Sequence, residues 1–178
     1  MLTSYVTREK ASYFIRTAGR RAVLGAMLLL PAACGKEPPP PPIPPTLVNV
    51  QISATNSVNA MQDGRGAPVT IRVYQLASKT TFDGQEFFTL YKNDAATLGA
   101  DVIKKDEFLL VPGTSKTLNL KPLDPVRAIG VFAGYRDFQN VVWRASANIP
   151  AHQTTTITVT AGKSGLVLDA KSVKPVSP

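Results

Sequence analysis

The residue types that most often carry out catalysis or bind metal ions are scarce in this sequence. There is one cysteine, Cys34, and one histidine, His152. A zinc-type site needs three or four ligands, and no Gly-x-Ser-x-Gly nucleophile motif accompanies His152. The Gly-Lys-Ser stretch at 162–164 ends like a phosphate-binding loop, but Ile157 stands where the first glycine of that motif belongs. We therefore predict a protein that is not an enzyme, holds no metal ion and needs no cofactor.

The chemistry that suits Cys34 is attachment of a lipid. It follows a basic N-terminal segment and an apolar run at 22–33, which is too short to span a bilayer because a spanning helix takes about 20 residues. Such a pattern is typical of a secretory signal peptide. The sequence before Cys34 resembles a bacterial lipobox, in which the cysteine sulfur receives diacylglycerol and becomes the mature N-terminus. Pro31 replaces the usual leucine of that motif, and Leu30 lies one place further back.

We therefore predict that residues 1–33 are a lipoprotein signal peptide and that Cys34 is lipidated; the alternative is a free or buried thiol. The pair Arg20-Arg21 is compatible with either a twin-arginine or a Sec export signal. In the usual lipoprotein sorting rule, an aspartate directly after the lipidated cysteine favours retention in the inner membrane. Gly35 stands at this position, so by resemblance to that rule we expect the protein to be in the outer membrane.

Residues 34–45 form the predicted lipidated N-terminus and a proline-rich linker. The stretch 38–45 contains seven of the 15 prolines in the chain. Such a run cannot form a helix or a central strand and adopts an extended polyproline II conformation. At about 3.1 Å per residue, residues 35–45 would span roughly 30 Å. We expect a stiff spacer that holds a folded domain away from the membrane.

The positive charge of the chain does not indicate nucleic-acid binding. The formal net charge is +8, but residues 1–33 contribute half of it, with five basic residues against one acidic residue. The remaining basic residues are scattered, and the longest run is the pair Lys104-Lys105. Because a nucleic-acid surface needs a basic stripe or patch, we predict no nucleic-acid partner.

Residues 46–174 form the predicted folded domain, and their pattern is mostly β. Short segments alternate apolar and polar residues, or are apolar throughout, and turn residues separate them. About eight such strands argue for a β-sandwich or barrel. The expected strands are 47–53, 69–76, 107–113, 116–120, 127–135, 140–149, 153–161 and 165–170. The charged residues of 101–107 are expected to form a solvated connection.

One segment, 82–99, has a helical pattern instead. Phe87, Leu90 and Tyr91 recur at helical spacing. We expect the aromatic residues Phe87, Phe88 and Tyr91 to belong to the core. Two capping features complete the prediction. Asp83 is the expected N-cap with Glu86 as its capping-box partner, and Asp94 is expected to cap a second turn that stops at Gly99.

The connection at 54–68 is long for a hairpin, whose loop usually has 2–5 residues. It is rich in Asn and Gly, and Val58 and Met61 look exposed in it. Long loops on rigid sandwiches often carry binding function. The alternative is a loop tip without a role.

The order of these segments resembles the TssJ/VasD (SciN) lipoproteins of type VI secretion systems. The matching motifs are PVTIRVYQL, FDGQEFFTLYKNDAATLGAD, EFLLVPG and AIGVFAGYRDFQNVVWRAS, which follow one another behind the lipobox as in that family. The resemblance covers roughly residues 46–170. It implies a transthyretin-like β-sandwich with an added helical element.

The resemblance also implies a function. Members of this family lie in the periplasmic leaflet of the outer membrane and bind the periplasmic C-terminal domain of the inner-membrane protein TssM. The loop tied to that contact corresponds to 55–66. The resemblance implies that Val58 and Met61 are apolar anchors. It also implies that hydrogen bonds to the partner come from Asn56, Asn59 and Asp63. The competing hypotheses are a generic periplasmic lipoprotein with a structural or ligand-binding role, and an enzyme on the same scaffold.

Overall fold

A computed structural model describes residues 40–174 of the chain. The predicted signal peptide, Cys34 and the first residues of the proline-rich linker lie outside the described residues. Residues 41–45 form neither helix nor strand, and β1 begins at Leu47. In chain order the elements are β1 (Leu47–Ala54), β2 (Val69–Leu76), α1 (Thr80–Gly84), α2 (Phe87–Leu98), a 3-10 turn (Gly99–Asp101), β3 (Val102–Leu110), β4 (Ser115–Leu120), β5 (Ala128–Ala133), β6 (Arg144–Asn148), β7 (Thr154–Gly162) and β8 (Gly165–Val173).

The eight strands form a sandwich of two four-stranded sheets. One sheet has the order β4-β1-β7-β8 and the other has the order β3-β2-β5-β6. Within the first sheet β1 is parallel to β7 and antiparallel to β4. The predicted mostly β fold with a small helical insertion is therefore confirmed, and all eight expected strands are present.

The main core lies between the sheets and follows from the alternation of the strands. Every second residue of β1 and of β2 points inward, so Val48, Val50, Ile52, Ile71 and Val73 are buried together. Complete burial of one such side chain contributes about 1.5–3 kcal/mol. The polar residues between them face the other way, which gives each strand its alternating pattern.

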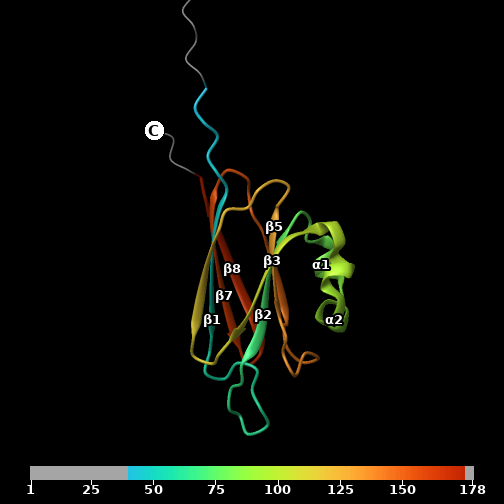
Figure 1. The fold of residues 1–178 in the computed structure, drawn as a ribbon. Helices are drawn as coiled ribbons and strands as arrows, with labels where there is room; N and C mark the ends of the chain where they lie inside the picture. The colour runs from blue at the N-terminus through green and yellow to red at the C-terminus, as the bar shows by residue number, and fades with distance from the viewer. Residues whose placement is uncertain (1–39, 175–178) are drawn as a thin grey trace, which may run out of the picture. The chain divides into compact units, whose positions relative to one another are not determined.

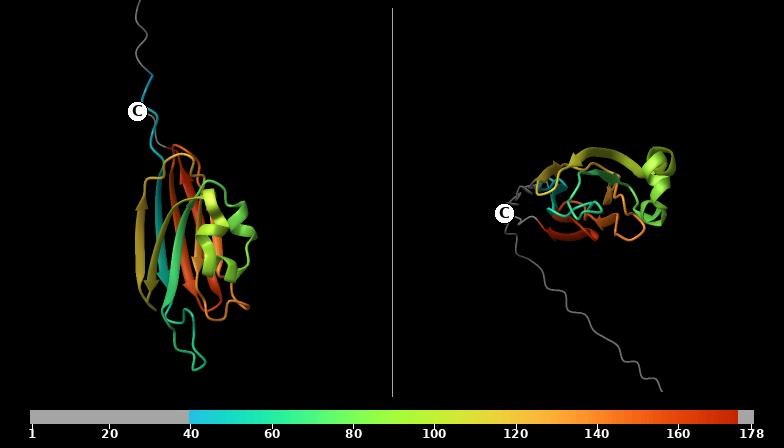
Figure 2. Two further views of the ribbon diagram at one scale, coloured as in Figure 1. Left: turned by 45° about the vertical axis from the view of Figure 1, so that its right-hand side comes forward. Right: turned by 90° about the horizontal axis from the view of Figure 1, so that it is seen from below.

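A second core covers the outer face of the other sheet, where α1 and α2 pack (Figures 1 and 2). Phe82 of α1 and Leu90 of α2 are completely buried against Tyr74 and Phe132 of the sheet. Because β5 lies under both cores, all six of its residues are buried. This explains why its sequence is apolar without alternation.

The predicted capping box of the helical segment is wrong. Asp83 lies inside α1, where its Oδ2 accepts a hydrogen bond from Ser146 Oγ at 3.1 Å and pairs with Lys79 Nζ at 3.2 Å. Glu86 is the N-cap residue of α2 but makes no side-chain cap hydrogen bond. The acidic residue therefore ties α1 to β6 instead of capping a single long helix.

The aromatic residues of α2 are only partly in the core. Phe87 is buried and stacks on Phe138 with ring centroids 4.4 Å apart. Phe88 and Tyr91 are 51% and 47% exposed, so the expectation that they are core residues is wrong. The buried face of α2 follows Phe87, Leu90, Asp94 and Leu98, a helical stripe to which positions 88 and 91 do not belong.

A buried polar network holds α2 on the sheet. The helix kinks at Asn93, whose φ/ψ of −139°/38° is not helical. Arg72 of β2 donates to the carbonyls of Leu90 and Tyr91 at 3.0 and 3.2 Å, which supplies partners near the kink. Asp94 lies inside α2, where its Oδ1 accepts from the Ala95 N–H at 2.9 Å, so the expectation that it caps a second turn is wrong. The C-cap of α2 is Gly99, where the helical segment was predicted to stop.

Asp94 is also the acceptor at the centre of this network. Its Oδ2 accepts hydrogen bonds from Tyr74 Oη at 2.8 Å and Lys105 Nζ at 2.9 Å, and lies 3.6 Å from Arg72 Nη1. Burial acts to raise the pKa of Asp94, but the hydrogen bonds from Lys105 and Tyr74 and the charge of Arg72 outweigh it, so the pKa is lowered. Burial beside this carboxylate raises the pKa of Tyr74, which keeps its hydroxyl protonated.

Residues 102–107 form the first part of β3 and Asp101 ends the preceding 3-10 turn, so the expectation that 101–107 is a connection is wrong. Most of these residues are exposed, as expected. β3 is an edge strand that pairs only with β2. Charged side chains on an edge strand discourage pairing with another chain. Lys104 and Lys105 therefore belong to a regular strand, although their charge suggested a loop.

The N-terminal linker and the loop between β1 and β2 lie at opposite ends of the sandwich (Figures 1 and 2). We call these ends the arm end, where residues 41–46 enter β1, and the loop end. The loop end consists of the β1–β2 loop (55–68), the β3–β4 turn (111–114), the β5–β6 loop (134–143) and the β7–β8 turn (163–164). Within residues 40–174, no helix has the length and hydrophobicity needed to cross a bilayer.

Candidate functional site

The β1–β2 loop is folded onto the sandwich at its base and projects at its tip. At the base, the Thr55 N–H donates to Ala161 O and the Ala67 N–H to Val58 O, both at 2.9 Å. At the tip, the Met61 N–H donates to Arg65 O at 2.8 Å and closes a tight turn. These bonds give the loop a defined shape. A loop that is already ordered loses less conformational entropy on binding, which favours its use as a docking surface.

Gly66 is required where the two sides of the loop meet. A Cβ atom at this position would overlap the backbone carbonyl of Asn56. Asn56 itself is exposed, with its side-chain oxygen close to Gly113 of the β3–β4 turn. The predicted contact residue Asn56 therefore lies at the base of the loop and remains accessible.

Val58 is completely buried, so the expectation that it is exposed is wrong. Its side chain belongs to the core between the sheets. The loop turns back at its base, so Val58 lies beside Ala67 and both side chains are buried. Val58 anchors the loop to its own domain, and Met61, which is half-buried at the tip, is the apolar residue that a partner can reach.

Asn59 joins two loops that are far apart in sequence. Its Nδ2 donates to Pro68 O at 2.9 Å, and its Oδ1 accepts from the backbone N–H of Arg136 at 2.9 Å. It is 8% exposed and has a positive φ of 47°, which Asn tolerates better than most residues. Because both ends of its amide are bonded within the chain, Asn59 positions the β1–β2 loop against the β5–β6 loop.

Asp63 lies at the loop tip and is paired with Arg65. Its Oδ2 accepts from Arg65 Nε at 2.7 Å and its Oδ1 from the Arg65 backbone N–H at 3.1 Å. The side-chain hydrogen bond from Arg65 lowers the pKa of Asp63. The carboxylate is ionised at neutral pH, but its charge is largely balanced locally.

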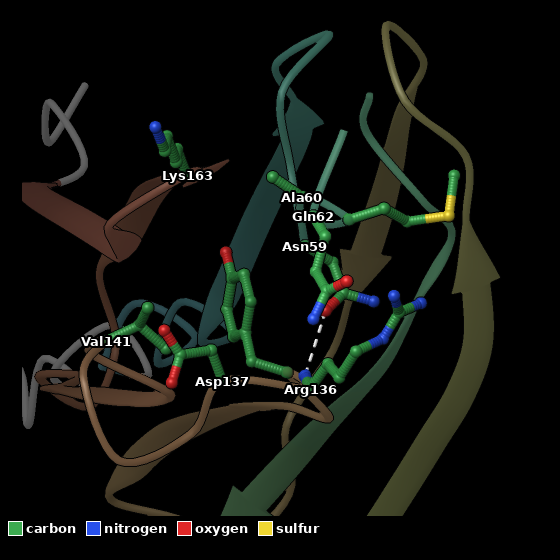
Figure 3. Close-up of a pocket in the computed structure, with 9 residues that line it drawn as sticks. Asn59, Ala60, Gln62, Arg136, Asp137, Val141 and Lys163 are labelled. Atoms are coloured by element: carbon green, nitrogen blue, oxygen red, sulfur yellow. Dashed lines mark hydrogen bonds between the residues drawn. The ribbon is translucent and has the colours of Figure 1, made fainter. Parts of the chain in front are cut away.

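A pocket of about 370 Å³ lies beside this loop (Figure 3). It is bounded by the β1–β2 loop, the start and middle of the β5–β6 loop, and the β7–β8 turn. Tyr135 belongs to the β5–β6 loop, and its hydroxyl donates to Gly162 O at the end of β7 at 3.0 Å. Burial raises the pKa of Tyr135 to about 12, so it remains a neutral donor. The lining residues are Asn59, Ala60, Met61, Gln62, Tyr135, Arg136, Asp137, Val141 and Lys163.

The pocket is shaped by loops and turns, and its lining combines polar, charged and apolar side chains. No group of three His, Cys, Asp or Glu side chains within residues 40–174 could hold a metal ion. His152 is at the arm end, far from the pocket, where its Nδ1 lies 2.9 Å from Pro44 O. The Gly-Lys-Ser stretch is the β7–β8 turn, as its β context indicated.

The family comparison decides which kind of binding protein this is. Residues 46–164 match the protein family described as type VI secretion lipoprotein, VasD, EvfM, TssJ. The chain belongs to this family. The resemblance inferred from the order of the motifs is therefore confirmed.

Solved structures of type VI secretion lipoproteins share the fold. The T6SS lipoprotein TssJ1 from Pseudomonas aeruginosa is 32% identical with a TM-score of 0.69, over 73% of this chain and 99% of that chain. Serratia marcescens Lip, described as a membrane-bound component of the type VI secretion system, is 29% identical with a TM-score of 0.62, over 72% and 97%. A chain in a structure described as the T6SS protein TssM C-terminal domain from EAEC has the same fold at 23% identity and a TM-score of 0.56, over 69% and 97%. A comparison with curated proteins gives no match.

For this type VI secretion lipoprotein, the sequence patterns did not indicate the five pocket residues that lie outside the β1–β2 loop. These residues come from segments that are far from that loop in sequence: Tyr135, Arg136, Asp137, Val141 and Lys163. No spacing pattern connects them, and only the sandwich topology brings their turns to the same end.

Two aspartate substitutions in the β1–β2 loop are expected to behave in opposite ways. Val58→Asp places an unpaired charge in the core and should lower the free energy of unfolding by about 3 kcal/mol or more. Met61→Asp changes an accessible tip residue and should leave the unfolding temperature within about 2 °C. It should nevertheless weaken partner binding about tenfold, because apolar anchors carry much of the energy of an interface.

The measurements are thermal unfolding followed by circular dichroism, and calorimetric titration with the partner domain. Leu123→Asp, which replaces an exposed apolar residue of the β4–β5 connection at the arm end, makes the same kind of change away from the loop and should bind like wild type. Equal binding by wild type and Met61→Asp would place the contact elsewhere.

Proposed function

We propose that this type VI secretion lipoprotein anchors a trans-envelope complex to the outer membrane from its periplasmic face. In this proposal, acyl chains on Cys34 hold it in the membrane, and the loop end binds the periplasmic C-terminal domain of a TssM-like inner-membrane protein. The protein acts as a docking component and not as an enzyme. The segment boundaries 1–33, 34–45 and 46–174 are part of the proposal.

The observation that carries the proposal is the position of the arm and the β1–β2 loop at opposite ends of the sandwich (Figure 1). An anchor at the arm end directs the loop end away from the membrane. The loop end also contains both the ordered β1–β2 loop and the pocket beside it. The partner class is taken from the structure described as the TssM C-terminal domain, in which a chain of this fold occurs.

The last residues of the arm, next to β1, are held by the domain, which supports a defined direction for the anchor. The His152 backbone N–H donates to Thr46 Oγ1 at 2.9 Å, and its Nδ1 lies 2.9 Å from Pro44 O. His152 has a positive φ of 60°, which turns the β6–β7 connection toward the arm. We expect the prolines that precede this contact in the sequence to extend the arm as a stiff chain.

The test is binding between the solubilised full-length lipoprotein and the periplasmic C-terminal domain of the TssM homologue from the same genome. We expect a complex on size-exclusion chromatography and saturable binding in calorimetry. Absence of binding at about 100 µM of each protein, well above the Kd of a specific complex, would overturn the proposal. It would favour the alternative, a periplasmic lipoprotein with another structural or ligand-binding role.

A further inference from the structure

Two basic side chains on the walls of the loop-end pocket lack a carboxylate partner. Arg136 and Lys163 are both exposed, and neither forms an ion pair with any residue between 40 and 174. The other arginine of this end, Arg65, is neutralised by Asp63 at 2.7 Å. Asp137 is the one acidic residue of the pocket, and its Oδ1 accepts from Asn140 Nδ2 at 2.7 Å.

The backbone holds both basic residues in fixed places. Arg136 is set by its N–H bond to Asn59 Oδ1, which also fixes the β1–β2 loop (Figure 3). Lys163 is set by a second junction, between the β7–β8 turn and the β5–β6 loop. There the Val142 N–H donates to Ser164 O at 3.2 Å and the Leu166 N–H donates to Val142 O at 2.7 Å.

Gly165 permits this second junction. Its φ is +109°, a conformation that favours glycine, and a Cβ atom there would overlap the backbone of Val142. The β7–β8 turn can therefore approach the β5–β6 loop closely enough to form the bridge. Lys163 and Arg136 then line the same pocket from two different turns (Figure 3).

Between the two basic residues the pocket is partly apolar. Met61 and Val141 are half-buried lining residues, and the buried Tyr135 also lines the pocket. A negatively charged segment with an apolar side chain matches this surface, because charge complementarity selects acidic groups and the apolar residues provide an anchor.

We propose that this pocket binds an acidic segment of the partner, whose carboxylates pair with Arg136 and Lys163. The inference rests on the proposed function, since it assigns the contact to the partner that docks at the loop end. It extends the interface from the β1–β2 loop to the β5–β6 loop and the β7–β8 turn. Asn59 has the positioning role in this interface.

The test compares charge-reversal variants of the full-length lipoprotein in binding to the TssM homologue's periplasmic domain. Arg136→Glu and Lys163→Glu should each weaken binding about tenfold, and the double variant more than either, since each replaces an attraction by a repulsion. Lys121→Glu makes the same charge change at the arm end and should bind like wild type. All variants should keep the wild-type unfolding temperature because the side chains are exposed.

Salt dependence supplies an independent measurement. Raising NaCl from about 50 to about 500 mM should weaken wild-type binding and should affect the double variant much less, because salt screens exposed ion pairs. Wild-type binding together with unchanged affinity of both Glu variants would overturn this inference and leave the proposed function intact. If a Glu variant is poorly folded, the neutral variants Arg136→Gln and Lys163→Gln replace it, and unchanged affinity of these two variants would overturn the inference equally.

Discussion

Replacing Cys34 with serine is expected to move the lipoprotein almost completely from the membrane fraction to the soluble periplasmic fraction. Serine has no thiol to receive diacylglycerol, so the chain loses its acyl chains. Each buried CH₂ of an acyl chain contributes about 0.8 kcal/mol of membrane affinity, and stable anchoring takes more than one chain. The loss therefore changes an anchored protein into one that exchanges freely with solvent.

The measurement is fractionation of cells followed by immunoblotting, in a strain without the TssM homologue so that a partner cannot retain the variant. Pro31→Leu is the matched control, since it restores the usual lipobox residue and should remain in the membrane fraction. The Ser variant should have the circular dichroism spectrum of the mature domain. Its retention in the membrane fraction of that strain would contradict the anchor assignment.

The second large effect is expected from Asp94→Ala. The substitution leaves the hydroxyl of the completely buried Tyr74 without its acceptor and removes a carboxylate from between Lys105 and Arg72. The Asp94 side chain is only 12% exposed, and removal of one partner from such a site costs about 3 kcal/mol. Asp94→Asn keeps an acceptor for Tyr74 and should cost less.

The pH dependence of stability gives the same network a second readout. Because the pKa of Asp94 is lower in the folded chain than in the unfolded chain, its ionised form stabilises the fold at neutral pH. That contribution is present above the ordinary pKa of 3.8 and is lost as the pH falls through the lowered folded value. Asp94→Asn should therefore make the unfolding free energy less dependent on pH in this acid range.

Urea unfolding at several pH values measures both effects. Asp169→Ala is the control, because Asp169 pairs with Lys171 at 3.4 Å on the surface with both side chains mostly exposed. Such pairs contribute about 0–1 kcal/mol. Similar losses for Asp94→Ala and Asp169→Ala would show that the buried network does not hold α2 on the sheet.

The parts of the fold that follow a simple periodicity could be predicted from sequence. β1 alternates through Val48, Val50 and Ile52, and the same residues are buried. β5 is apolar throughout because it lies between two cores. These patterns depend only on which face of a strand is covered.

The errors at Asp83 and Val58 have a common physical cause, which is contact between segments that are not adjacent in sequence. Asp83 resembles an N-cap, but Ser146 of β6 supplies its hydrogen-bond partner. Val58 looks exposed in a polar loop, but the loop folds back and buries it. The pocket beside Met61 depends on three turns that only the finished sandwich brings together. Local composition contains no information about such contacts.

The pairing of β1 determines how the domain bears mechanical load. β1 follows the arm directly and lies inside its sheet, with six residue pairs to β4 on one side and eight to β7 on the other. In the proposed arrangement, tension between a membrane anchor at the arm end and a partner at the loop end would act along the axis of β1. The hydrogen bonds of β1 run across the strand direction, perpendicular to it in the antiparallel pair with β4 and slanted in the parallel pair with β7. This force therefore shears both ladders at once instead of opening them one bond at a time. Pulling along this axis should therefore require more force than peeling an edge strand, which suits a tether between two membranes.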